Sequence, residues 1–77
     1  MSTTIDTLIQ LAAKKFKADA EKLSADDDLF DALGIDSVQA LELLSELELE
    51  FDVEVPDYEL QEVKTFKQLA EVIDERL

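Results

Sequence analysis

The apolar residues between positions 37 and 51 recur at the spacing of an α-helix, and this pattern constrains the fold more than any other feature of the chain. With successive residues about 100° apart, one face collects Ala40, Leu43, Leu44, Leu47 and Phe51. Asp36 and Gln39 have the spacing of a capping box, which makes Asp36 the N-cap and Ser37 the first helical residue. We therefore predict an amphipathic helix over residues 37–51 with its apolar face in the core.

The residues before this helix predict a first helix and a long connection. Apolar residues repeat at helical spacing over residues 3–16, and Thr3 or Thr4 can cap the start. Residues 17–36 then form a loop, and a loop of this length in a small chain is often functional. Within it we expect three core anchors, Leu29, Phe30 and Leu33.

The residues after the helix predict two more helices. Asp57 is expected to cap a short helix over residues 58–62, because Pro56 ends any extension of the preceding helix. Thr65 and Gln68 have capping-box spacing and open the last helix. Its expected buried face holds Phe66, Leu69, Ala70, Ile73 and Leu77.

Composition agrees with an all-α fold. The 77 residues include one Gly and one Pro, which favours helices over a turn-rich β fold, and they include no Cys or His. The chain must therefore fold on apolar packing, without disulfides or a zinc site of the His/Cys type. We predict a single domain over residues 1–77, a monomeric small four-helix bundle of three main helices and a short third one, with a long loop between the first and second.

Several classes of protein are not expected. No apolar run reaches the roughly 18 residues of a membrane span, and the N-terminus lacks the pattern of a signal peptide, so we expect a cytoplasmic protein. The acidic cluster Asp26, Asp27, Asp28 and Asp31 lacks the glycine and the ligand spacing of an EF-hand. We therefore predict no dedicated metal site.

The charge of the chain indicates what kind of partner it meets. The net charge is −13, and residues 23–63 contain fourteen Asp and Glu but no Lys or Arg. Such a field repels nucleic acid and speeds encounter with basic protein surfaces. Val38 and Leu49 lie near the acidic stripe of Glu42, Glu46 and Glu50, away from the apolar face. We interpret this side of the helix as a contact surface.

Ser37 is a hydroxyl without the means to activate itself. Nucleophilic catalysis needs a nearby base, and the chain has no His or Cys and no Lys or Arg in residues 23–63. Asp36 already provides the helix cap, which leaves the Ser37 hydroxyl to point outward, and Gly34 gives the chain conformational freedom just before it. We expect no enzymatic activity, and we interpret Ser37 as a residue that another enzyme modifies.

The run Leu33-Gly34-Ile35-Asp36-Ser37-Val38, with the later Val55-Pro56-Asp57, resembles the acyl carrier proteins over almost the whole chain. The resemblance implies that Ser37, beside Asp36, receives a 4′-phosphopantetheine arm from coenzyme A. A holo-carrier synthase, which is a phosphopantetheinyl transferase, would attach it. Acyl intermediates of fatty acid, lipid or polyketide biosynthesis would then ride on its thiol as thioesters.

The resemblance also implies a set of partners and contact residues. The partners would be acyl transferases, ketosynthases or acyl-activating enzymes with basic docking patches. Together with the contact surface above, the expected partner-binding residues are Asp36, Val38, Glu42, Glu46, Glu48, Leu49 and Glu50. The residues expected to line an acyl pocket are Leu43, Leu47, Phe51, Val63 and Leu69.

The sequence departs from the common pattern of fatty-acid carriers near the serine and further along the helix. Val38 replaces the usual Leu, Gln39 follows where an acid is common, and Leu49 interrupts the run of acids. Such changes alter the surface that partners contact, so we predict a specialised carrier. Two alternatives remain open: an aminoacyl carrier of the peptidyl or D-alanyl type, and an acidic helical adaptor with an unmodified serine.

Overall fold

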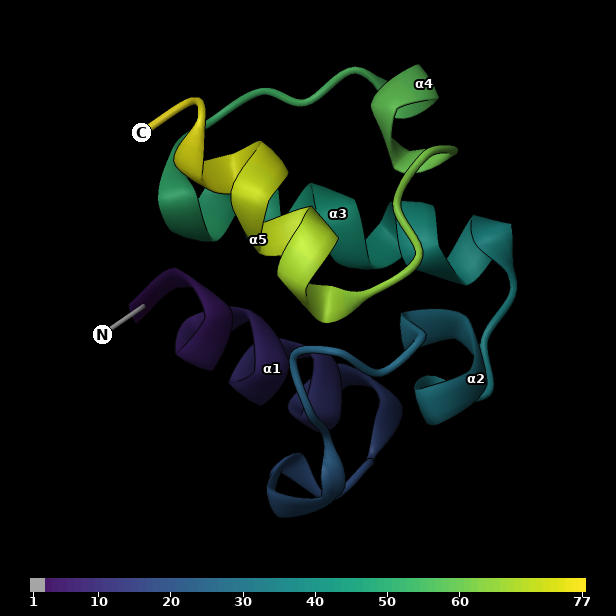
Figure 1. The fold of residues 1–77 in the computed structure, drawn as a ribbon. Coiled ribbons are helices and arrows are strands. Elements are labelled where there is room, and N and C mark those ends of the chain that lie inside the picture. The colour runs from purple at the N-terminus through teal and green to yellow at the C-terminus, as the bar shows by residue number, and fades with distance from the viewer. Residues whose placement is uncertain (1–2) are drawn as a thin grey trace.

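The chain folds as a set of helices, as the sequence predicts. The computed structural model describes residues 3–77, with only the backbone of Thr3. Its elements, in chain order, are α1 (Thr3–Phe16), the short 3₁₀ helix η1 (Ala20–Lys22), α2 (Leu29–Leu33), α3 (Ser37–Phe51), α4 (Asp57–Leu60) and α5 (Phe66–Asp74) (Figure 1). The described residues form no strand, only an isolated bridge between Asp28 and Thr65. The all-α prediction is confirmed.

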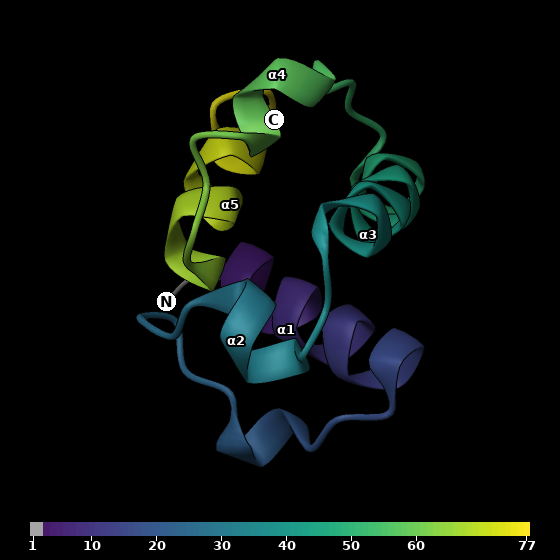
Figure 2. The same ribbon diagram turned by 90° about the vertical axis from the view of Figure 1, so that its right-hand side faces the viewer.

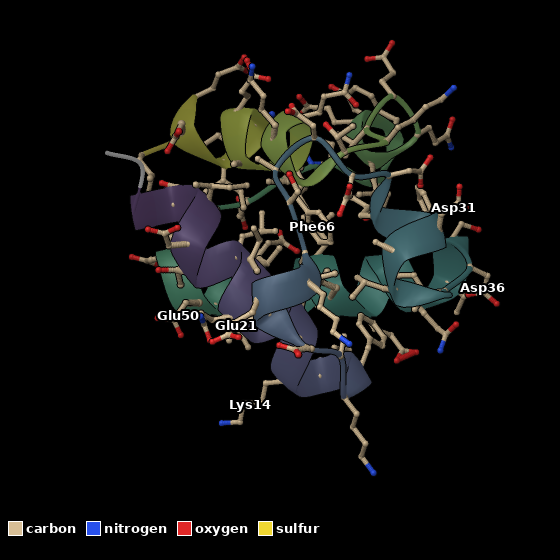
Figure 3. The ribbon with its side chains drawn as sticks, turned by 60° about the horizontal axis from the view of Figure 1, so that its bottom comes forward. Lys14, Glu21, Asp31, Asp36, Glu50 and Phe66 are labelled. Atoms are coloured by element: carbon tan, nitrogen blue, oxygen red, sulfur yellow. The ribbon has the colours of Figure 1, made fainter. Side chains whose placement is uncertain are left out.

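The helix α1 packs against several of the other helices. It lies beside α5, α3 and α2, and Figure 2 shows α1 crossing beneath α3 and α5. The core between them is apolar, and Phe66 at its centre is fully buried (Figure 3). The predicted inner face of α3 is confirmed at four positions, Ala40, Leu43, Leu44 and Leu47, whereas Phe51 at the helix end is half-buried.

The long loop predicted over residues 17–36 is more ordered than expected. It contains η1 and the five-residue helix α2. The Asp28 side chain caps α2 by accepting from the amides of Phe30 and Asp31, and Leu29 is completely buried. A helix of five residues is too short to show a periodic pattern in the sequence. Its stability comes instead from one cap, Asp28, and one buried side chain, Leu29.

Three predicted details of the helix ends are wrong. Thr4 does not cap α1, because it lies within the helix and its side chain is buried. Its hydroxyl donates to the Asp74 carboxylate of α5 at 2.5 Å. The Thr3 side chain lies outside the described residues. Asp57 is the first residue of α4, which ends at Leu60 and has no side-chain cap. Leu77 is 67% exposed, because α5 ends at Asp74 before this residue can reach the core.

Among the described residues, no helix is long and apolar enough to span a bilayer.

The chain's one glycine has a clear structural role. Gly34 ends α2 with φ +66°, and its amide donates to the carbonyl of Phe30. A Cβ at this position would meet no other atom within 4 Å. Glycine is therefore required for its backbone conformation and not for space, and it turns the chain from α2 toward α3.

We expect Gly34→Ala to lower the free energy of unfolding by about 1 kcal/mol, because alanine disfavours the left-handed conformation. Gly34→Asn should lose less, since asparagine tolerates that conformation. Urea unfolding of the two variants and the wild type measures both differences. Equal stability of Gly34→Ala and wild type would contradict this role for Gly34.

Candidate functional site

The start of α3 is fixed by two reciprocal hydrogen bonds. The Asp36 Oδ1 accepts from the Gln39 amide at 2.9 Å, and the Gln39 Oε1 accepts from the Asp36 amide at 3.2 Å. The predicted capping box is thus confirmed, and Ser37 is the first residue of the helix. The corresponding box of Thr65 and Gln68 at α5 is confirmed as well.

The Ser37 side chain is exposed at this helix start. Within the described residues its hydroxyl has no hydrogen-bond partner, since Asp36 supplies the cap. The ionisable residue that lines the adjacent hollow is Asp57, and among the described residues no hydrogen bond joins its carboxylate to the Ser37 hydroxyl. The hydroxyl is therefore accessible to a second protein, and this chain supplies no group to activate it.

A mainly apolar hollow of about 360 Å³ opens beside Ser37, where α2, α3 and α4 meet. Its lining residues are Phe30, Ser37, Leu41, Asp57, Leu60 and Gln61. Ser37 and Leu41 lie one helical turn apart on the same side of α3, so the hollow begins at the serine and continues along the helix. A space of this size is within the range of small-ligand sites.

The residues predicted to line an acyl pocket lie elsewhere. Leu43, Leu47, Val63 and Leu69 are buried in the closed core, and Phe51 is half-buried at its margin. None of them lines the hollow beside Ser37. Sequence reasoning missed Phe30, Leu41 and Leu60 as lining residues. The spacing of Ser37 and Leu41 is a usable signal for one of them, but the position of α4 is not visible in the sequence.

The exposed side of α3 carries the two predicted apolar contacts. Val38 is 63% and Leu49 is 85% exposed, and Glu42 lies between them on the same outward line. At 1.5 Å per residue, Val38 and Leu49 are about 16 Å apart along the axis. Figure 3 shows Asp36 and Glu50 at opposite edges of the molecule, so this face extends along most of one side.

The acidic residues predicted to bind partners differ in their environments. Lys15 of α1 lies 3.3 Å from the Glu46 carboxylate and 4.0 Å from that of Glu42. Glu48 is half-buried, and its Oε2 accepts from the Val55 amide at 3.1 Å. Asp36 and Glu50 are exposed. Sequence analysis missed both the Lys15 ion pairs and the Glu48 contact, since each joins residues from different elements.

No group of three or more acidic side chains among the described residues is arranged to hold a metal ion. The chemistry that the site supports is that of a presented hydroxyl. It lies at the start of a long helix, with an apolar hollow on one side and an acidic face with two apolar residues on the other.

The capping box makes a testable contribution to stability. We expect Asp36→Ala to lower the free energy of unfolding by about 1 kcal/mol, the usual cost of losing a cap. Asp36→Asn should lose less, because its side-chain oxygen still accepts from the Gln39 amide. Thermal or urea unfolding of the pair measures the difference. If Asp36→Asn were as destabilised as Asp36→Ala, charge and not the hydrogen bond would be the main contribution.

Comparisons with known proteins agree with this geometry. The family model described as the phosphopantetheine attachment site matches residues 6–73. An acyl carrier protein of Phenylobacterium zucineum is 32% identical over 77 residues, which is 100% of this chain and 98% of the relative. Those of Bdellovibrio bacteriovorus (30% over 66 residues, 86% and 85%) and Chlorobium phaeovibrioides (31% over 68 residues, 88% and 87%) are also similar. Such proteins are carriers rather than enzymes, and their covalent prosthetic group is 4′-phosphopantetheine. The chain belongs to the acyl carrier protein family.

Proposed function

We propose that Ser37 is the residue to which 4′-phosphopantetheine is attached and that the chain carries acyl groups as thioesters on this arm. The observation that carries the proposal is the exposed Ser37 hydroxyl at the start of α3, freed from capping by Asp36. A phosphate ester here would meet the positive end of the helix, which favours anions. The residues present therefore fit the group.

The chemistry requires little of this chain. The Ser37 oxygen would attack the phosphorus next to the pantetheine of coenzyme A, the bond to the adenosine bisphosphate would break, and the serine proton would pass to the transferase. Because no base among the described residues is hydrogen-bonded to the Ser37 hydroxyl, the transferase would provide the base together with its own metal ion. The role of Ser37 and Asp36 is to hold the hydroxyl in an accessible position.

The hollow beside Ser37 supports carriage of an apolar cargo. Three apolar side chains line it, Phe30, Leu41 and Leu60, and a chain attached through Ser37 would reach it first. The predicted acyl pocket of Leu43, Leu47, Phe51, Val63 and Leu69 remains a prediction. Leu43, Leu47, Val63 and Leu69 belong to the same buried core cluster as Leu60, and Phe51 packs against that cluster.

The outward face of α3 supports a role in partner selection. We propose that basic surfaces of biosynthetic enzymes contact five acidic residues on α3 and at its N-cap, and that Val38 and Leu49 add apolar contacts. The five acids are Asp36, Glu42, Glu46, Glu48 and Glu50. The exposed apolar residue Leu49 among acids is the feature that supports a specialised carrier. We also propose that the carrier is a cytoplasmic monomer and that residues 1–77 form one domain.

The attachment is tested by intact-mass measurement after incubation with a phosphopantetheinyl transferase, coenzyme A and Mg²⁺. We expect a gain of one phosphopantetheine in the wild type and none in Ser37→Ala. Ser45→Ala is the matched control, because Ser45 is an exposed serine on the same helix whose hydroxyl donates to the Leu41 carbonyl; this variant should load normally.

An unmodified wild type beside a loaded reference carrier would refute the proposal and favour the adaptor alternative. Loading of the holo chain by an adenylating amino-acid ligase, and not by an acyl-loading enzyme, would favour an aminoacyl carrier.

The contact role of Leu49 gives a separate prediction. Leu49→Glu should leave the free energy of unfolding within about 0.5 kcal/mol, as is usual for exposed positions, while it changes the kcat/KM with which an acyl-loading enzyme uses the holo chain. Tyr58→Glu is the control, since Tyr58 is similarly exposed but lies on α4. A large loss of stability would show that Leu49 packs in the core. Unchanged kinetics would show that it is no contact.

A further inference from the structure

The helix α4 forms one wall of the hollow beside Ser37, yet little in its own sequence stabilises it. It has four residues, and its N-cap Pro56 makes no side-chain hydrogen bond. Isolated helices this short are unstable in water. The position of α4 must therefore depend on contacts with the rest of the chain.

The residues of α4 divide into two opposite sides. Asp57, Leu60 and Gln61 line the hollow together with Ser37 and Leu41. Glu59 lies on the other side of the helix, where its carboxylate forms an ion pair with the guanidinium of Arg76. The helix is thus held between the start of α3 and the residues that follow α5.

Arg76 is well placed for this contact. Its second guanidinium nitrogen donates to the Val72 carbonyl at 3.1 Å, which orients the side chain from α5. Both partners of the ion pair are largely shielded, with about a quarter of each side chain exposed.

The charge around α4 increases the importance of this one cation. Between residues 52 and 62 the chain has five acidic residues and no Lys or Arg, and α3 beside it is acidic too. In the described residues, the two cations that form ion pairs are Lys15, with α3, and Arg76, with α4. Without Arg76, repulsion among the acids would favour movement of α4 away from α3.

We propose that Arg76 is a positioning residue for the site at Ser37: its ion pair with Glu59 holds α4 near α3, and so keeps in place the wall of the hollow that would shelter an acyl chain attached at the serine. This inference rests on the proposed attachment at Ser37. Because the apolar residues Leu60 and Val63 also anchor the segment in the core, loss of the ion pair should loosen α4 without unfolding the protein.

The first measurement is amide hydrogen exchange on the unmodified chain, which does not depend on any attached group. The amides of Gln61, Glu62 and Val63, which follow α4, donate to three carbonyls within it, those of Tyr58, Glu59 and Leu60. We expect Arg76→Ala and Glu59→Gln each to speed their exchange by about fivefold, the effect of losing a partly shielded ion pair. Exchange in the middle of α1 should not change.

The second measurement is the hydrolysis rate of an octanoyl thioester carried by the holo chain. Arg76→Ala and Glu59→Gln should hydrolyse several-fold faster than the wild type, because the hollow no longer shelters the chain. The exchanged pair Arg76→Glu with Glu59→Arg should restore both measurements toward the wild type. Lys14→Ala is the matched control, since it removes one exposed cation from α1 and should change neither.

Three results would overturn the proposal: unchanged exchange in both variants, a uniform rise across all helices in both, or faster α4 exchange with unchanged thioester hydrolysis. The last would show that α4 moves without affecting the hollow. A chain that cannot be loaded at Ser37 would instead refute the proposed function, and the exchange measurement would still decide whether Arg76 positions α4.

Discussion

The reciprocal hydrogen bonds between Asp36 and Gln39 set the geometry on which the rest of the structure depends. They fix the first residue of α3, and the start of a helix determines the direction of every later side chain. With Ser37 first, the residues Ala40, Leu43, Leu44 and Leu47 are directed into the core, whereas Val38 and Leu49 are directed outward. The same two bonds leave the Ser37 hydroxyl free. A local cap therefore decides both how the bundle packs and which group it presents.

The acidic charge explains how the remaining elements are positioned. A stretch of forty-one residues without a cation would repel itself, and the structure places cations from either end of the chain against it. Lys15 contacts Glu42 and Glu46 of α3, and Arg76 contacts Glu59 of α4. Partly exposed ion pairs contribute little to global stability. Their effect here is to hold particular elements in place while most acids remain available to a basic partner.

The sequence predicted the features that depend on neighbouring residues. Periodicity and cap spacing are local properties of the sequence. They predicted the bounds of α1 and α3, both capping boxes and the buried face of α3. It missed α2, whose stability depends on the burial of Leu29, and the hollow, which three separate elements line. It also misplaced Leu77, because no local signal showed that α5 ends at Asp74. Both α2 and the hollow require contacts between distant parts of the chain.

Attachment at Ser37 is tested most directly by fragmentation mass spectrometry of the loaded protein, which locates the attached group. Trypsin cuts after Lys22 and Lys64 but nowhere between them, so residues 23–64 form one peptide that contains Ser24, Ser37 and Ser45. We expect phosphopantetheine on Ser37 alone, the serine that the Asp36 cap leaves exposed at the start of α3. Modification of Ser24 or Ser45, or an unmodified peptide from a chain treated with active transferase, would contradict it.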